Sequence, residues 1–245
     1  MLSEEIKLIN FYLEILGVDK YYVDIGASNG IGASNTFHLA RKKWGGIVIE
    51  SDAKQFAILS NNLITQNTKK IQLKISSKNI VGVLEACECP KAFSFQNIDI
   101  DSCDFHVLRS LRKVYRPLLI CAEINERIPP PCKFTVRDGI DSSLLGGAFY
   151  GMSIAKCAEL CEQHNYDIVS LHFNNFFLVP RENNKWKSLS VSDAYALGYV
   201  RREVRQIFFF GIVPMITCWI WRKIVCELSW LSYLQIRRTS MTCRS

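Results

Sequence analysis

The residues of this chain that could do chemistry begin in a glycine turn and at the end of the strand after it. Residues 22–30 read Tyr-Val-Asp-Ile-Gly-Ala-Ser-Asn-Gly, an apolar strand leading into Gly26 and Gly30, and a second apolar strand ends at Glu50. Glycines let the backbone approach a ligand closely, and a carboxylate at the tip of the next strand can accept both ribose hydroxyl hydrogens. The spacing predicts a nucleoside-binding site. The alternative is that the glycines form only a tight turn, which Asp24 caps.

The charge of this turn indicates which nucleoside it binds. The chain lacks the G-x-G-x-x-G triplet that brings pyrophosphate to a helix N-terminus, and it carries Asp24 two residues before Gly26. An anion there repels pyrophosphate but attracts a ligand with an ammonium group and a sulfonium, as in S-adenosylmethionine. We therefore predict S-adenosylmethionine as the cofactor. The predicted cofactor-binding residues are Asp24, Gly26, Ser28, Gly30, Glu50 and Asp99.

Further oxygen-bearing side chains follow two later strands. Asp99 and Asp101 end one strand, and Glu123 and Asn125 end the next. Alternate strand residues point the same way, and ligands bind at the carboxyl ends of parallel strands, so these side chains are expected to converge. An aspartate inside an apolar strand such as Asp99 is costly unless it is paired or faces a cleft. Another interpretation is that Asp101 and Asp104 cap the following helix.

The elements that must position these residues alternate regularly between strand and helix. Apolar strands at 23–25, 47–49, 71–75, 95–100 and 118–122 are each followed by a helical or loop segment. This order predicts an α/β fold with a mostly parallel sheet and helices on both faces. The closing pair at 168–171 and 176–179 is joined by an Asn-Asn turn, so the last strand is expected to run antiparallel.

The basic surplus lies in the C-terminal quarter of the chain. Residues 1–180 contain 19 basic and 19 acidic residues, and the remainder contains 11 basic and 4 acidic. A neutral core argues against a nucleic-acid substrate. No export signal precedes the first helix, and the ten cysteines include no C-x-x-C pair, so a cytoplasmic chain without zinc is expected.

The predicted organisation has four parts. They are an N-terminal packing helix at 1–20, a catalytic domain at 21–181, a polar linker at 182–205 and a hydrophobic, basic tail at 206–245. The apolar stretches of the tail are too short, or too interrupted, to span a bilayer alone, but their aromatic and basic flanks suit a membrane surface. The alternative is a helix packed on protein.

Six segments in the same order give the chain a resemblance to the FkbM-like family of S-adenosylmethionine-dependent methyltransferases, from Tyr22 to about Arg181. They are Val23–Gly30, Ile49–Ser51, Ile98–Asp104, Glu123–Asn125, Tyr150–Ser153 and Asn174–Val179. The resemblance implies a Rossmann-like class I methyltransferase fold with seven strands, and O-methylation of a hydroxyl on a saccharide, glycolipid or secondary metabolite. Ser102 stands where the family usually has glycine, so a different loop path is expected after Asp101.

Methyl transfer to a hydroxyl also requires a group that takes the proton. We predict Asp101 and Glu123 as the catalytic residues, with Asp101 as the better base and His106 as a weaker candidate. A second route uses a divalent ion held by the oxygen ligands Asp99, Asp101, Glu123 and Asn125, and it is not favoured. His164 and His172 lack ligand spacing and are expected to serve the fold.

Two classes of function follow. The first is an S-adenosylmethionine-dependent O-methyltransferase with a small-molecule or glycan acceptor. The second is a catalytically silent cofactor-binding module, anchored by its C-terminal tail. The departure from the family at Ser28 and Asn29, where the family often has Asn-Asp, keeps the second class open.

Overall fold

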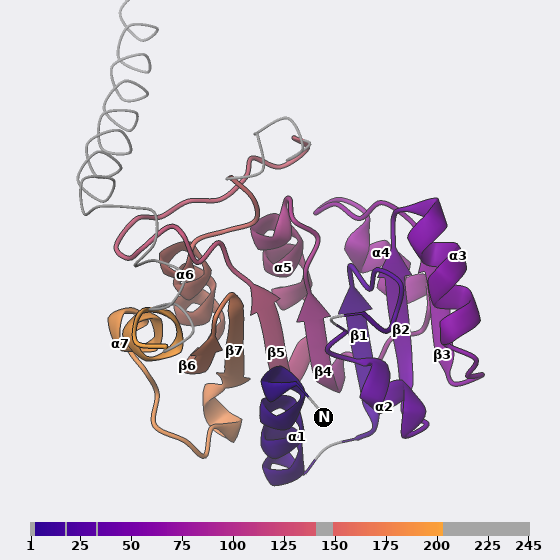
Figure 1. The fold of residues 1–245 in the computed structure, drawn as a ribbon, viewed down its shortest axis with the longest axis horizontal. Coiled ribbons are helices and arrows are strands. Elements are labelled where there is room, and N and C mark those ends of the chain that lie inside the picture. The colour runs from indigo at the N-terminus through magenta and orange to yellow at the C-terminus, as the bar shows by residue number, and fades with distance from the viewer. Residues whose placement is uncertain (1–2, 18, 33, 141–148, 203–245) are drawn as a thin grey trace, which may run out of the picture. The chain divides into compact units, whose positions relative to one another are not determined.

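The structure is a computed structural model that describes residues 3–17, 19–32, 34–140 and 149–202. Strands and helices alternate along most of the chain, as the sequence predicts (Figure 1). The strands are β1 (Tyr21–Ile25), β2 (Gly45–Glu50), β3 (Thr68–Gln72), β4 (Ala92–Ile98), β5 (Arg116–Glu123), β6 (Tyr166–His172) and β7 (Asn175–Pro180). The helices are α1 (Glu4–Leu16), α2 (Phe37–Arg41), α3 (Ala53–Asn62), α4 (Ile80–Ala86), α5 (Asp104–Arg112), α6 (Ile154–His164), η2 (Arg181–Asn183), α7 (Val191–Tyr195) and η3 (Ala196–Val200).

The seven strands form one sheet in the order β3-β2-β1-β4-β5-β7-β6. The first five strands of this order are parallel, while β7 runs antiparallel to both of its neighbours. The predicted seven-stranded, mostly parallel sheet is confirmed, and so is the antiparallel direction of the last strand. The carboxyl ends of β1, β2, β4 and β5 therefore lie along one edge of the sheet, where the predicted site residues follow them.

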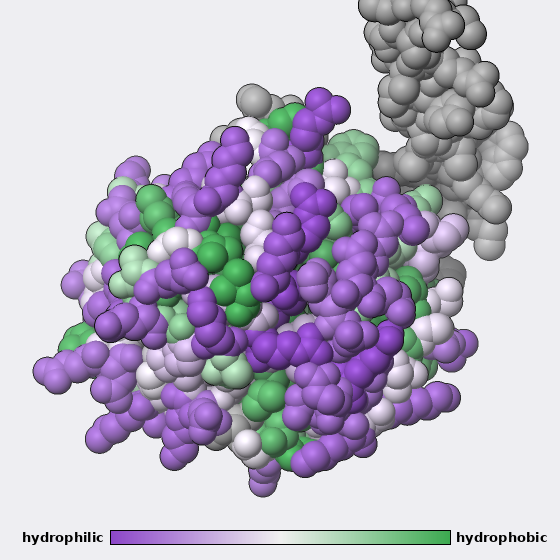
Figure 2. All heavy atoms as spheres, turned by 180° about the vertical axis from the view of Figure 1, so that it is seen from behind, coloured by the Kyte–Doolittle hydropathy of each residue, from purple (hydrophilic) through white to green (hydrophobic). Residues whose placement is uncertain are grey.

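Two apolar clusters cover the two faces of the sheet. Alternate residues of each strand point to opposite faces, so Tyr22 packs under α1, α2 and α3, while Val23 packs under α4, α5 and α6. Each of these helices turns its apolar side inward. Its outer side is polar, and hydrophilic side chains cover most of the face opposite to that of Figure 1, with apolar ones in small groups (Figure 2).

The first helix begins and ends at residue types that favour helix boundaries. The Ser3 hydroxyl accepts a hydrogen bond from the Ile6 amide at 3.2 Å, and the helix ends at Gly17, whose φ of 65° is left-handed. Its buried residues Ile9 and Leu13 pack on the sheet. The predicted packing helix within 1–20 therefore lies against the core.

The segment predicted as a polar linker is partly helical where it is described. Within 182–205, α7 and η3 bury Ala194 and Tyr199 in the same apolar cluster as Leu171 of β6. A Cβ at Gly198 would lie 2.2 Å from the Leu171 carbonyl oxygen, so η3 rests directly on the backbone of β6. Small and aromatic residues within an otherwise polar stretch give this segment its packing face. No helix among the described residues is long and apolar enough to cross a membrane, and the tail at 206–245 lies outside those residues.

Candidate active site

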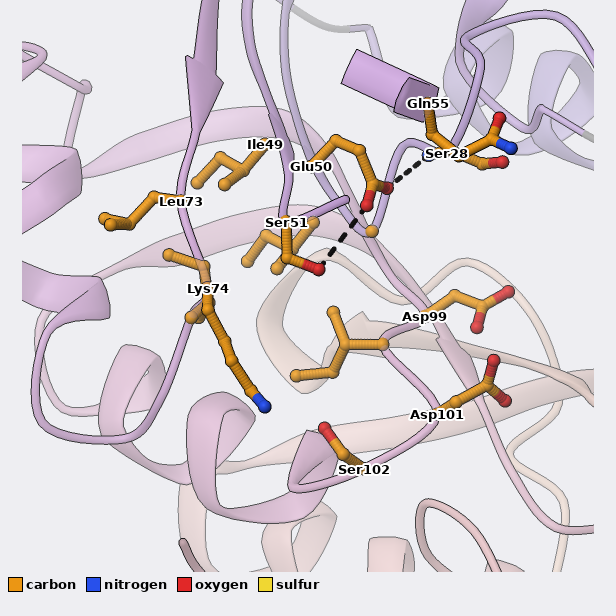
Figure 3. A pocket seen from close by; sticks show the side chains of 14 residues that line it. Ser28, Ile49, Glu50, Ser51, Gln55, Leu73, Lys74, Asp99, Asp101 and Ser102 are labelled. Carbon is orange, nitrogen blue, oxygen red and sulfur yellow. Dashed lines mark hydrogen bonds between the residues drawn. The ribbon is translucent and has the colours of Figure 1, made fainter. Parts of the chain in front are cut away.

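A pocket of about 350 Å³ opens at the carboxyl ends of the parallel strands (Figure 3). The glycine turn after β1, the ends of β2 and β3 and the segment after β4 line it. Among the predicted site residues, Gly26, Ser28, Glu50, Asp99 and Asp101 belong to this lining. The structure thus brings together residues that lie up to 75 positions apart in the chain, from Gly26 to Asp101.

Backbone donors on two sides hold the Glu50 carboxylate in place. Its Oε2 accepts a hydrogen bond from the Ser28 amide at 2.8 Å, and its Oε1 accepts one from the Asp52 amide at 2.7 Å. Ser28 has a left-handed φ of 47°, which turns its amide toward the end of β2. The Ser51 hydroxyl also donates to Oε1, at 3.4 Å, so Oε2 is the oxygen that keeps capacity for one more hydrogen bond (Figure 3). A diol with two neighbouring hydroxyl donors could bond Oε2 and replace the long Ser51 contact at Oε1.

Gly26 is glycine because the ends of two strands meet there. Its φ is 89°, and a Cβ on it would lie 1.7 Å from the Asp99 carbonyl oxygen. The Asp99 amide donates to the Ile25 carbonyl at 2.9 Å, which closes the gap between β1 and β4. Gly30 also has a positive φ, of 78°, but it packs on Leu59 and Leu63 of α3 and does not line the pocket.

Asp24 lies beside the pocket and not in its lining. It is buried. Its Oδ2 accepts a hydrogen bond from the Thr36 hydroxyl at 2.5 Å, and its Oδ1 accepts one from the side-chain amide of Asn97 at 2.9 Å. Burial is the main cause that raises its pKa to about 6. Asp24 joins β1 to β4 and to the start of α2. Its buried position does not support the predicted direct contact with a bound cation.

Three carboxyl groups from two strand ends form a cluster at the pocket edge. Ligand oxygens of Asp99, Asp101 and Glu123 lie within 4.8 Å of one another. Glu123 has only 9% of its surface exposed, and the Oε2 atom has no hydrogen-bond partner outside the cluster. Burial first, and then the charge of Asp99, raise the pKa of Glu123 to about 10. These surroundings favour the protonated form of Glu123 at neutral pH, and burial also raises the pKa of Asp99.

Within this cluster, the groups differ in what they can do. The protonated form of Glu123 can donate a hydrogen bond, and its catalytic role stays a prediction. Asp99 and Asp101 both line the pocket, and Asp101 is the more exposed of the two. Asp99 and Asp101 lie side by side in Figure 3, on the side of the pocket away from Lys74.

The loop after β4 explains why glycine is not required at position 102. The left-handed residue of this loop is Asp101, with φ of 54°, and Ser102 is outside that region. Asp104 fixes the loop, because its two carboxylate oxygens accept hydrogen bonds from the Ile100 and Ser102 amides, both at 2.9 Å. Burial raises the pKa of Asp104 to about 7. Asp104 thus fixes this loop, and the N-cap position of α5 is Cys103, whose side chain makes no capping hydrogen bond, in place of the expected Asp101.

The other candidate groups take part in the fold. Asn125 is fully buried, and its side chain contacts the backbone of Arg127 and Tyr150. His106 has its Nε2 3.2 Å from the Val136 carbonyl, away from the cluster. The carboxyl groups that could hold a divalent cation are therefore Asp99, Asp101 and Glu123.

Three residues at the site were not predicted to belong to it. Gln55 of α3 and Lys74, just after β3, line the pocket. Asn174 donates from Nδ2 to Oε1 of Glu123 at 2.7 Å. Gln55 and Lys74 follow the ends of predicted strands, so a search for polar residues after each strand could have found them. The contact of Asn174 depends on the order of β5, β7 and β6 in the sheet, which no sequence pattern specifies.

Comparison with solved structures shows the same fold in other proteins. One is a protein from Klebsiella pneumoniae described as a candidate O-methyltransferase, with 17% identity over 74% of this chain and 81% of that chain, and a TM-score of 0.50. Another is the O-methyltransferase TomG from Streptomyces achromogenes in complex with S-adenosylmethionine, with 14% identity, the same coverage of both chains and a TM-score of 0.50. A candidate caffeoyl-CoA O-methyltransferase from Staphylococcus aureus has 13% identity over 73% of this chain and 83% of that one, with a TM-score of 0.50.

At these identities the similarity establishes the fold alone, which is the Rossmann-like fold of class I methyltransferases. No family model and no curated protein sequence matches the chain.

Proposed function

We propose that this protein is an S-adenosylmethionine-dependent methyltransferase that transfers a methyl group to a hydroxyl. The observation that carries the proposal is the Glu50 carboxylate, which the Ser28 and Asp52 amides hold at the pocket, where Oε2 is open to a ribose hydroxyl and Oε1 could accept the second one in place of the long Ser51 contact. The carboxyl cluster on the opposite side of the same pocket attracts a cationic ligand.

The residues present fit this cofactor. Gly26 leaves the backbone bare where two strand ends meet, which lets a ligand approach closely. Apolar side chains of Ile49, Leu73 and Ile100 in the lining suit the flat faces of a base. When bound, S-adenosylmethionine supplies a methyl group that its sulfonium has already activated.

For the chain itself, the chemistry consists of positioning and proton handling. Alignment of the acceptor hydroxyl can supply much of the rate, because the methyl group needs no further activation. We infer that Asp101 accepts the hydroxyl proton, since it lines the pocket and is the most exposed carboxyl group of the cluster. Glu123, whose pKa burial raises, lies beside Asp99 and Asp101 in this cluster.

The finer assignment rests on the resemblance to the FkbM-like family. The segments that carry it include the β1 turn, the end of β2 and the segment after β4, and these three meet at the pocket. The resemblance supports a saccharide, glycolipid or secondary metabolite as acceptor. The basic and apolar tail supports attachment to a membrane surface, which would bring the enzyme to a lipid-linked acceptor.

Calorimetry with S-adenosylhomocysteine tests the pocket. We expect wild-type protein to bind this product, and Glu50→Ala to weaken binding by about 10- to 100-fold, because two hydrogen bonds to a charged group are lost. The matched control is Asp52→Ala, which removes a neighbouring acid that caps α3 by accepting from the Lys54 and Gln55 amides. Asp52→Ala should lower the free energy of unfolding by about 1 kcal/mol and leave the affinity nearly unchanged.

Activity is tested by labelled methyl transfer from S-adenosylmethionine to an extract of the source cells. Transfer that Asp101→Asn reduces by about 100-fold or more would support the proposed base. Tight uptake of a nicotinamide coenzyme, with no heat from S-adenosylhomocysteine, would reject the cofactor assignment. Binding of S-adenosylhomocysteine without transfer to any acceptor would favour the cofactor-binding module.

A further inference from the structure

The orientation of the Glu123 carboxyl group depends on one residue of the turn between β6 and β7. Its Oε1 atom accepts a hydrogen bond from Nδ2 of Asn174 at 2.7 Å, while Oε2 is buried at the cluster with Asp99 and Asp101. Asn174 therefore determines which oxygen of Glu123 faces the site.

The turn itself is fixed to β5 by its backbone. His172 pairs with Asn175 across the hairpin, so Phe173 and Asn174 are its two loop residues, and Phe173 has a left-handed φ of 53°. The Asn174 carbonyl accepts from the Ile124 amide at 2.8 Å. Asn174 thus holds the end of β5 twice, through its backbone and through its side chain.

Two elements far apart in the chain hold this turn from outside. On one side, the Phe173 amide donates to the Gly198 carbonyl of η3 at 3.0 Å, and Gly198 leaves no room for a Cβ against Leu171. On the other side, the buried His172 ring lies between two acids of α1, with Nε2 2.7 Å from Glu4 and Nδ1 2.6 Å from Glu5. These contacts act on Phe173 and His172, one and two positions before Asn174, and their residues are not in the pocket lining.

We propose that Asn174 is a positioning residue that orients Glu123 in the carboxyl cluster, and that α1 and η3 hold Asn174 in register for this task. The proposal rests on the proposed function for its catalytic meaning, since Glu123 and its neighbours are the groups that handle the proton. The residues at 4–5 and 196–200 would then support the carboxyl cluster although they do not line the pocket.

Exchange of the Ile124 amide hydrogen with deuterium reports on the contact between the Asn174 turn and the end of β5. It needs neither cofactor nor acceptor. We expect Asn174→Ala and Asn174→Asp to speed this exchange by about tenfold or more, because each loses the side-chain donor to Glu123. Asn174→Asp also sets a carboxyl group against Glu123. The double variant Glu123→Gln with Asn174→Asp reverses the polarity of the pair, so that the glutamine amide donates to the aspartate, and should restore slow exchange.

A matched control is Asn184→Ala, which removes another loop asparagine. Its side chain donates to Asp167 at 2.8 Å and accepts from the Trp186 amide at 2.9 Å. This control should leave Ile124 exchange and methyl transfer at the wild-type level. Gly198→Ala, in which the added Cβ must displace η3 or the turn, should speed Ile124 exchange while exchange in β2 stays unchanged.

The rate of labelled methyl transfer to the cell extract then tests whether the orientation of Glu123 affects the reaction. We expect Asn174→Ala to bind S-adenosylhomocysteine within about threefold of wild type but to transfer methyl at least about tenfold more slowly. Wild-type exchange at Ile124 in both Asn174 variants, or failure of the reversed pair to restore it, would overturn the proposal. If wild-type protein transfers no methyl while Ile124 exchange responds as expected, the proposed function fails and the positioning of Glu123 by Asn174 stands.

Discussion

At the scale of single residues, burial decides what each acid of the sheet edge can do. Asp24 lies in β1, and Glu50 ends the neighbouring strand β2. Backbone amides at the pocket hold Glu50, whereas buried side chains bond both oxygens of Asp24. The first arrangement leaves lone pairs for a ligand and the second uses them within the protein. We therefore assign binding to Glu50 and structural support to Asp24.

This assignment predicts a pH effect for Asp24→Asn. The folded-state pKa of Asp24, about 6, is above the ordinary value of 3.8, so its contribution to stability is fully present below pH 3.8 and is lost as the pH rises through 6. The loss is at most about 3 kcal/mol. An asparagine can accept from Asn97 and donate to the Thr36 hydroxyl, so the variant should lose less stability than wild type between about pH 4 and pH 7.

Urea unfolding of both proteins across this pH range measures the difference. Affinity for S-adenosylhomocysteine should stay within about threefold of wild type, because Asp24 does not line the pocket. Equal pH dependence of the two proteins, or an affinity loss as large as that of Glu50→Ala, would show that Asp24 acts on the ligand itself.

The residue types of the site could be predicted from the sequence better than their protonation. Glycines and acids at strand ends indicated Gly26, Glu50, Asp99 and Asp101, and all four line the pocket. The raised pKa of Glu123 could not be predicted, because it arises from burial and from acids that belong to another strand. Such effects depend on distances, and a sequence gives only order.

At the scale of elements, the close meeting of β1 and β4 makes Gly26 the most sensitive position of the turn. Gly26→Ala places a Cβ within 1.7 Å of the Asp99 carbonyl at a φ of 89°. We expect a loss of at least about 2 kcal/mol in the free energy of unfolding, or failure to fold. Gly82→Ala on α4 is the control, because no atom lies within 4 Å of its added Cβ. It should stabilise the protein by about 0.5–1 kcal/mol.

Thermal unfolding of the two glycine variants compares a glycine that the backbone requires with one that it does not. Similar melting temperatures for both would contradict the close approach of β1 and β4.

The repeated strand-helix pattern predicted the central parallel strands, because buried strands are mainly apolar. The third strand was predicted at 71–75 and lies at Thr68–Gln72, because this edge strand is largely polar. The packing of η3 on β6 was not predicted, since a few buried residues inside a polar stretch give no clear period.

At the scale of the whole molecule, the catalytic apparatus and the basic surplus lie in different parts of the chain. The pocket and the carboxyl cluster belong to residues 25–123, within the first 180 residues, which together are neutral in charge, while the surplus follows residue 180. We predict that deletion of 206–245 releases the protein from membrane fractions, because these residues carry the basic and apolar segments that suit anionic lipid. S-adenosylhomocysteine affinity of the truncated protein should match that of the full chain.

Partitioning between membrane and soluble fractions, followed by calorimetry on the truncated protein, checks this prediction. Unchanged partitioning would reject the membrane anchor. A Glu227→Lys variant of the full chain, which adds positive charge to the tail, should bind vesicles with anionic lipid more tightly and neutral vesicles no better.

The position of β7 between β5 and β6 has a consequence for synthesis on the ribosome. β6 is made before β7, yet it has no place in the sheet until β7 has emerged and paired with β5. The growing chain must therefore carry β5 with one bare side, next to the half-built site, until about residue 180 has left the exit tunnel. During that interval the nascent protein is open to pairing with foreign strands, and a chaperone that shields apolar segments would find its target there.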